Sequence, residues 1–199
     1  MKTYNRGMMG VGTLIIFIAV ILIAAIAASV LITTGGSLQQ KALITGSQTE
    51  ESIASGVEAV TVVGSDSSPL DLTPHFIGDF KILTRLQSGS RGVNLNNTIV
   101  TVDTETDSSN FIYNQTVVVD TLSESTSMFL IYYAQTGTNH EDGYLNRGDV
   151  AKFIFHLPTE IGENQLVRIK IIPRIGAYTQ IEFYTPDSMT QETVGLWPT

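Results

Sequence analysis

Residues 8–34 form an apolar run that constrains every fold open to this chain. These 27 positions contain no charged side chain and no proline, and most of them are Ala, Ile, Leu or Val. A helix over residues 8–32 would be roughly 37 Å long at about 1.5 Å per residue, which exceeds the roughly 30 Å hydrocarbon core of a bilayer. A helix that is apolar on every side must be surrounded by lipid or by other protein.

The residues on either side of the run predict its orientation and its shape. Lys2 and Arg6 precede it, and positive charge on that side predicts a cytoplasmic N-terminus and an external body. Gly35 and Gly36 follow it. Two adjacent glycines weaken a helix, so we expect a bend or a loosened turn there.

Beyond the glycines, the helix is predicted to continue with one apolar side. Ile53, Val57 and Val60 are spaced as on one face of a helix, which is expected to run to about Val63 and to end at the Gly, Ser and Pro residues of 64–69. The predicted organisation is therefore a leader at 1–7, a helix at 8–64 and an outer domain at 65–199.

The outer domain is predicted to be rich in β-structure. Short runs of β-branched and aromatic residues alternate with Gly, Asn, Asp and Ser, as in an antiparallel sandwich of immunoglobulin-like type. The strands are expected at 76–86, 93–103, 111–120, 128–135, 150–156, 166–173 and 178–184. The predicted fold class is α+β, with a long N-terminal hydrophobic α-helix followed by an antiparallel immunoglobulin-like β-sandwich.

Composition excludes several classes of partner. The formal net charge is −8 and the 11 basic residues form no cluster, so nucleic acid is not an expected partner. The chain has no cysteine, which excludes disulfides, a thiolate nucleophile and metal sites with cysteine ligands.

Two Asn-x-Thr triplets, at Asn96 and Asn114, are candidate acceptors for N-glycosylation. Attachment requires that the asparagine be exposed outside the cell. Both triplets lie in the part of the chain that we expect to be external.

The remaining motifs predict no chemistry. His75, His140 and His156 lack the spacing of metal ligands. Residues 139–143 together with Asp149 offer oxygen ligands of the kind that calcium prefers, but without regular spacing, so a solvated loop is favoured. The tripeptide at 147–149 matches a cell-adhesion motif, which a turn before a strand also explains. We expect no catalytic residue, no metal and no cofactor.

The segment 6–14, RGMMGVGTL, resembles the class III signal of archaeal flagellins (archaellins) and of related type IV pilins. In that family a prepilin-type signal peptidase cuts after a basic-Gly pair, which implies recognition of Arg6, Gly7 and Met8 and cleavage between Gly7 and Met8. The similarity continues at 36–42, and less specifically at 172–186. Bacterial pilins usually have Glu at the position of Gly12, so the resemblance to archaellins is favoured over one to bacterial pilins.

This resemblance implies a structural subunit of the archaellum, the swimming filament of archaea. The implied filament is a helical homopolymer, possibly with other archaellins, outside the cell; its precursor lies in the cell membrane. The implied partners are the signal peptidase, the archaellum assembly ATPase and a membrane platform. The implied filament-core residues are Leu14, Ile15, Phe17, Ile18, Ile21, Leu22, Ile26 and Leu31. Two alternatives stay open: an adhesive archaeal type IV pilus subunit, and a single-pass membrane-anchored β-sandwich binding protein.

Overall fold

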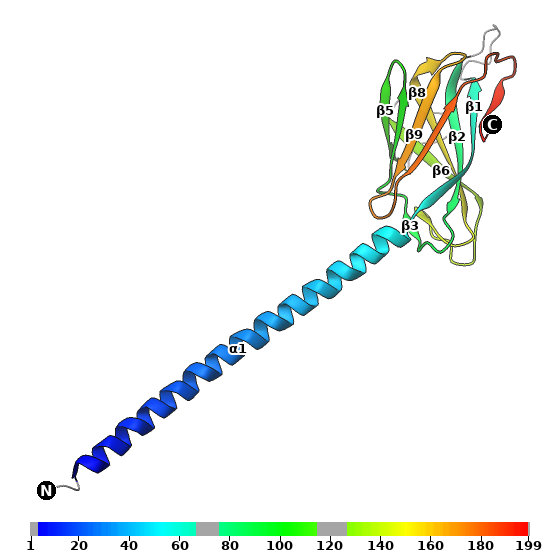
Figure 1. Cartoon of the computed structure of the whole chain (residues 1–199). Helices are drawn as coiled ribbons and strands as arrows, with labels where there is room; N and C mark the ends of the chain where they lie inside the picture. The colour runs from blue at the N-terminus through cyan, green and yellow to red at the C-terminus, as the bar shows by residue number, and fades with distance from the viewer. Residues whose placement is uncertain (1–3, 67–75, 115–126, 199) are drawn as a thin grey trace. The chain divides into compact units, whose positions relative to one another are not determined.

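The computed structural model describes residues 4–66, 76–114 and 127–198, with the backbone alone for residues 4–8 and 66. Within these residues one helix precedes a series of β-strands (Figure 1). The chain divides into two compact units, Met1–Thr49 and Glu50–Thr199. The elements are α1 Tyr4–Ala54, β1 Val57–Asp66, β2 Ile77–Leu86, β3 Val93–Asn94, β4 Ile99–Thr104, β5 Ser108–Tyr113, β6 Met128–Gln135, β7 Tyr144–Leu145, β8 Val150–Ile161, β9 Leu166–Ile172, β10 Thr179–Tyr184 and β11 Thr193–Trp197.

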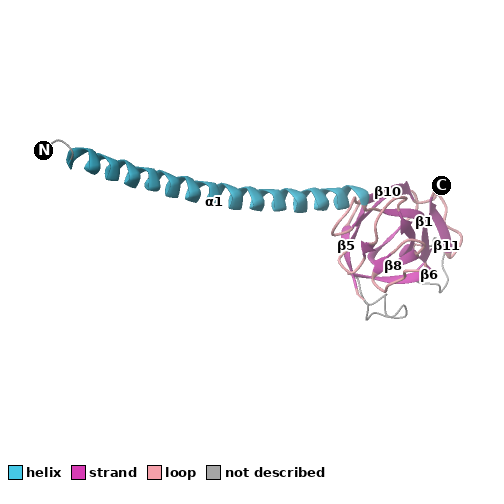
Figure 2. Ribbon diagram, turned by 90° about the horizontal axis from the view of Figure 1, so that it is seen from below, coloured by secondary structure: helices cyan, strands magenta, loops and turns pink. Residues whose placement is uncertain are grey.

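The helix α1 is unbroken from Tyr4 to Ala54, and Figure 2 shows a gentle curve without a sharp kink. The bend or loosened turn predicted at Gly35 and Gly36 is therefore wrong. Each glycine costs a helix only about 1 kcal/mol relative to alanine. That cost is small beside the backbone hydrogen bonds that a break would remove in so long a helix.

The helix ends earlier than predicted, at Ala54 rather than near residue 64. The amide of Ser55 donates the last helical hydrogen bond to the Glu51 carbonyl, at 3.0 Å. The amide of Gly56 then donates to Ser90 Oγ at 2.9 Å, and its carbonyl accepts from the Gln87 amide at 3.0 Å. The backbone of Gly56 is thus held by the β-domain, so the helix cannot continue through it.

The next ten residues form strand β1, which the sequence analysis assigned to the helix. The buried apolar side chains are Val57, Ala59 and Val62, so the side chains alternate between the two faces until the register shifts between Ala59 and Thr61. β-branched residues dominate this segment and favour an extended chain. The helical spacing of Ile53, Val57 and Val60 was coincidental.

Nine strands form one sheet, in the order β10-β9-β4-β5-β6-β8-β2-β1-β11, and β3 pairs with β7 in a second, small sheet. All neighbours are antiparallel except β5 and β6, which are parallel. The sheet curls until its ends approach each other, where Gly56 bridges to Ala177 and the Thr179 hydroxyl donates to the Val57 carbonyl. Figure 2 shows the strands surrounding a common interior. The predicted α+β class is confirmed.

Most expected strands are present, with changed boundaries. The expected strands at 76–86 and 128–135 correspond to β2 and β6, and that at 150–156 continues to Ile161 in β8. The single strand expected at 93–103 is two strands in different sheets, because a turn closed by the Thr98 amide and the Leu95 carbonyl separates them. Part of the strand expected at 111–120 lies outside the described residues. The sequence analysis missed β1, β7 and β11.

One apolar cluster fills the interior of the β-domain and receives side chains from both ends of the sheet. At its centre the ring of Phe155 lies parallel to that of Phe80, with centroids 5.6 Å apart, and 4.7 Å from that of Phe111. All three rings are fully buried. These rings join strands β2, β5 and β8 on the inner face of the sheet, and such aromatic pairs add stability beyond their burial.

We expect Phe155→Ala to lower the free energy of unfolding of the β-domain by about 3–5 kcal/mol, because it removes a fully buried ring and leaves a cavity. The measurement is urea unfolding of the detergent-solubilised full chain, followed by near-ultraviolet circular dichroism. Tyr184→Ala is the control: this ring is exposed, so its loss should change stability by less than about 0.5 kcal/mol. Equal effects of the two changes would contradict this account of the core.

Candidate assembly surface

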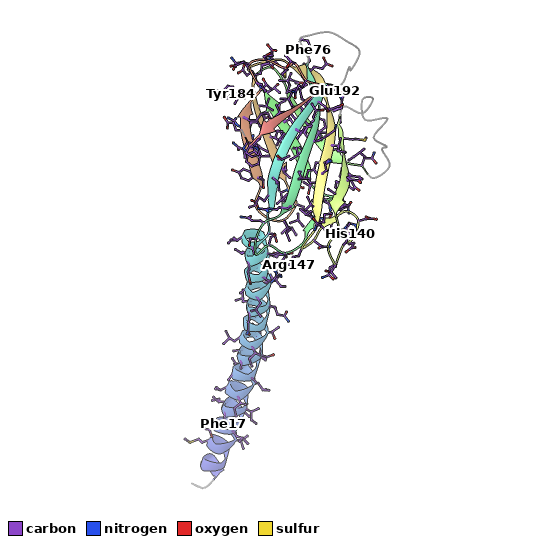
Figure 3. The ribbon with its side chains drawn as sticks, turned by 90° about the vertical axis from the view of Figure 1, so that its right-hand side faces the viewer. Phe17, Phe76, His140, Arg147, Tyr184 and Glu192 are labelled. Atoms are coloured by element: carbon purple, nitrogen blue, oxygen red, sulfur yellow. The ribbon has the colours of Figure 1, made fainter. Side chains whose placement is uncertain are left out.

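The surface of α1 is uncovered from residue 9 to residue 50. Every residue from 9 to 50 is exposed, and Figure 3 shows side chains, among them Phe17, projecting from the helix. The eight predicted filament-core residues have exposed fractions between 49% and 71%. They are Leu14, Ile15, Phe17, Ile18, Ile21, Leu22, Ile26 and Leu31.

These apolar side chains encircle the helix and do not form a stripe. Successive residues are rotated by about 100°, so the four consecutive residues 14–17 already cover the whole circumference. A single flat partner would therefore leave part of the surface exposed. The arrangement requires an apolar environment on all sides.

Four threonine hydroxyls on α1 need no outside partner. The hydroxyls of Thr33, Thr34 and Thr49 donate to the carbonyls four residues earlier, each at 2.8 Å. The hydroxyl of Thr13 donates to the Gly10 carbonyl at 2.9 Å. These threonines can therefore enter an apolar environment with their hydrogen bonds already made.

Two environments fit this surface. The helix has the length and composition to cross a membrane, with a mean hydropathy of 3.2 in its most apolar window. A bundle of identical helices would serve equally well. Relative to exposure to water, full burial of the eight predicted core side chains would contribute on the order of 10–20 kcal/mol per chain, before the entropic cost of association.

The three residues of the predicted cleavage site lie in the first turns of α1. Arg6, Gly7 and Met8 have helical backbone, so the bond between Gly7 and Met8 is part of the helix here. A peptidase that needs an extended substrate would have to unwind about one turn of the helix end.

The two candidate glycosylation sites differ in their surroundings. Asn96 is exposed in the turn after β3, and the hydroxyl of Thr98 in the same triplet is buried and donates to the Asn94 carbonyl at 3.1 Å. Asn114 is half-buried, with its amide 3.0 Å from Met128 Sδ. The threonine of this second triplet lies outside the described residues.

The loop between β6 and β8 is organised around a buried carboxylate that the sequence analysis considered as a calcium ligand and as part of an adhesion tripeptide. Asp149 is 2% exposed. Its oxygens accept from the amides of Gly137 at 2.6 Å and Asn146 at 2.9 Å, and one lies 3.4 Å from His140 Nδ1. Burial alone would raise the pKa of Asp149, but these donors outweigh it and hold the pKa below its usual value.

Tyr133 closes the other side of this loop. Its hydroxyl donates to the Tyr144 carbonyl at 3.0 Å and accepts from the Gly143 amide at 2.9 Å. Its ring meets the ring of His140 edge-on, 4.4 Å between centroids. Burial raises the pKa of Tyr133 to about 12, so the hydroxyl stays protonated and continues to donate. The loop is hydrogen-bonded rather than freely solvated.

These contacts show how Asp149 is used in the two motifs that contain it, the candidate calcium ligands and the adhesion tripeptide at 147–149. Both oxygens of Asp149 are engaged by protein donors, so the carboxylate is no free calcium ligand and is inaccessible to an adhesion receptor. Within the described residues no three His, Cys, Asp or Glu side chains gather as a metal site. His156 pairs with Asp79 at 2.8 Å on the strands, and His75 lies outside the described residues.

We expect Asp149→Asn to lower the free energy of unfolding by about 1–3 kcal/mol near neutral pH, because an amide NH₂ would then face backbone donors. The pKa of Asp149 is lowered by folding, so its contribution is present above about pH 4 and is lost as the pH falls through the folded-state pKa. The measurement is urea unfolding of both chains between pH 7 and pH 3, in which the difference should shrink on acidification.

Asp142→Asn is the matched control, since Asp142 belongs to the same loop and its side chain is 78% exposed. It should change the stability by less than about 0.5 kcal/mol. A pH-independent loss in the Asp149 variant would show that its charge does not hold the loop.

The comparisons with known proteins all point to one family. The family model of archaeal-type flagellin matches residues 7–183. Flagellin B1 of Methanocaldococcus jannaschii is 33% identical, over 96% of this chain and 95% of that relative. Flagellin B5 of Pyrococcus abyssi is 31% identical, over 96% of this chain and 99% of that relative.

Two solved structures share the fold. The archaeal flagellum of Methanospirillum hungatei matches with a TM-score of 0.68 and 17% identity, covering 94% of this chain and 98% of that chain. The crystal structure of an archaeal flagellin from Methanocaldococcus jannaschii matches with a TM-score of 0.61 and 23% identity, covering 72% of this chain and 97% of that chain.

Proposed function

Because this chain belongs to the archaeal-type flagellin family, a family of structural filament proteins, we propose that α1 is the surface through which its copies assemble. The chain is a subunit of the archaeal flagellum, or archaellum, and is not an enzyme. In the proposed filament the helices form the core and the β-domains face the surroundings.

The uncovered apolar surface of α1 carries this proposal. An isolated chain in water would expose apolar side chains around the whole helix, and water is the one environment that this surface cannot tolerate. Identical helices offer each other apolar surface on every side. The same surface is satisfied by lipid before assembly and by other copies after it.

The precursor is proposed to lie in the cell membrane with residues 1–7 in the cytoplasm. Lys2 and Arg6 would hold that end at the cytoplasmic face. Cleavage by the prepilin-type signal peptidase between Gly7 and Met8 would remove both charges. The remaining helix would then keep only its new N-terminal amine as a cation at that end, so fewer charges would have to enter the apolar interior, where each charge costs several kcal/mol.

Assembly is proposed to draw on two further partners. Moving a long apolar helix from lipid into a filament exchanges one apolar environment for another, so burial alone supplies little net driving force. An archaellum assembly ATPase and a membrane platform would supply the energy and the site of insertion. The filament would then extend outside the cell.

We expect the pair Ile16→Asp and Ile23→Asp to abolish filaments, because each carboxylate would be placed in the apolar surroundings of the core, where an unpaired charge is costly. The measurement is electron microscopy of cells that produce the altered full-length chain. A membrane-fraction assay must accompany it, since aspartate in a spanning helix also disfavours insertion by about 3 kcal/mol per residue.

Gln180→Asp with Gln191→Asp is the matched control, because it adds the same two charges at exposed positions of the β-domain. This variant should still form filaments. Normal filaments from the first pair would contradict the proposed role of α1, and loss of filaments in both pairs would show a general effect of charge.

Filament subunits are expected to begin at Met8. N-terminal sequencing and intact-mass analysis of sheared filaments should show the loss of residues 1–7, and any glycan on Asn96 or Asn114 would appear as added mass. Gly7→Leu should block cleavage and leave uncut chain in the membrane. Subunits that retain Met1 in wild-type filaments would refute the proposed cleavage.

A further inference from the structure

The outer face of the β-domain carries a row of exposed isoleucines. Ile99 in β4 stands opposite Ile112 in β5 and opposite Ile172 in β9, so the three side chains share one face. Their exposed fractions are 42%, 54% and 39%. We call Ile99, Ile112 and Ile172 the isoleucine row. Three adjacent exposed isoleucines form a contiguous apolar patch, which marks an interaction surface more often than an isolated exposed residue does.

The next row on the same face is polar. One step along the ladder, Thr101 in β4 stands opposite Asn110 and Lys170. The hydroxyl of Thr101 donates to the side chain of Asn110 at 2.9 Å. This row has ordinary water-facing character, so the apolar character is confined to one end of the strands.

The row beyond that is charged and paired. Asp103 stands opposite Ser108 and Arg168, and it binds Ser108 Oγ at 2.6 Å and Lys170 Nζ at 2.8 Å. Arg168 in turn pairs with Glu182 at 3.2 Å. Across three rows, the outer face therefore changes from apolar to polar to ionic.

The apolar end of this gradient is the end at which the chain enters the β-domain. The loop after Ile172 returns to that entry, where the Ala177 amide donates to the Ser55 carbonyl at 2.8 Å. The same loop carries the exposed side chains of Ile175 and Tyr178. The patch formed by the isoleucine row and this loop thus belongs to the part of the domain that is tied to the last turn of the helix.

Exposed apolar side chains are also present around the second half of α1. Residues 35–54 expose Leu38, Leu43, Ile44 and Ile53 among polar and charged side chains. This half is less uniformly apolar than residues 8–34, so it suits a boundary between a dry core and water.

The net charges beside the two surfaces are opposite. Arg174 lies between Ile172 and Ile175, is exposed, and forms no ion pair with any described residue. The second half of α1 carries exposed Lys41 and Glu50 and half-buried Glu51, so the two carboxylates outnumber the one cation. An arginine at the rim of an apolar patch favours a partner with a carboxylate at its rim.

We propose that the isoleucine row docks on residues 35–54 of α1 in a second copy of this chain. This inference rests on the proposed assembly through α1 and adds to it a specific contact between a β-domain and a neighbouring helix. A contact between two different patches of one chain is heterologous and generates an open helical filament when its rotation does not close. The charged row at the other end of the same strands stays in water.

The absence of cysteine from the chain allows a direct test with single cysteines. Full-length Ile112→Cys and Ser108→Cys chains are assembled into filaments in cells, and maleimide labelling rates are compared between sheared filaments and detergent-dissociated subunits. Both positions lie on β5 and on the same face, so Ser108→Cys is a matched control. We expect labelling at position 112 to slow at least tenfold in filaments, and labelling at position 108 to change less than threefold.

A second cysteine identifies the occupant. Ile112→Cys combined with Leu38→Cys, Leu43→Cys or Ile44→Cys should give a ladder of covalent multimers after oxidation of the filaments. At least one pair should form it, and the single-cysteine chains should not. Dimers from Ile112→Cys alone would show that a second β-domain covers the row, and they would overturn the proposal.

The remaining outcomes are also decisive. Equal labelling of position 112 in filaments and in free subunits overturns the docking site and leaves the filament function intact. Absence of filaments from cells that produce the unaltered chain overturns the proposed function itself. If Ile112→Cys does not assemble, the same measurement at Ile172→Cys decides, because that residue belongs to the same row.

Discussion

The apolar surface of α1 can be satisfied only by surroundings that exclude water on every side. Residues 8–34 of the helix carry no charged side chain, and the hydroxyls of Thr33 and Thr34 donate to nearby carbonyls, so this part of the helix needs few outside hydrogen bonds. Its apolar side chains need surroundings from outside the chain, because none of residues 9–50 is covered within the chain. Storage in a membrane and packing among identical helices both meet this demand, and the account of assembly follows from it.

The β-domain is stable in water because it contains its own core. Its Phe rings meet across the interior, and the outer face of β4, β9 and β10 carries ion pairs such as that of Arg168 with Glu182. The buried carboxylate of Asp149 holds the loop between β6 and β8 through backbone amides. The chain thus joins a β-domain with a water-facing polar surface to a helix whose apolar surface is unfavourable in water. The isoleucine row lies at the end of the β-domain where the chain enters it, because the loop after Ile172 returns to Ser55.

The sequence predicted the helix and the α+β class because a long uncharged apolar run and short β-branched runs are strong local signals. It misplaced the end of the helix because Ile53, Val57 and Val60 fit a helical period by chance. The hydrogen bonds that hold Gly56 come from Gln87 and Ser90, which are distant in the sequence. Similarly, β11 and the role of Asp149 depend on partners that no local pattern reveals. The isoleucine row requires the register of three strands.

The most direct test of the central claim is imaging of native filaments at a resolution that shows side chains. The account predicts that the side chains of residues 8–34 contact only α1 helices of other copies, in a core without water. A map in which these side chains face solvent, or in which the β-domains alone hold the subunits together, would contradict it.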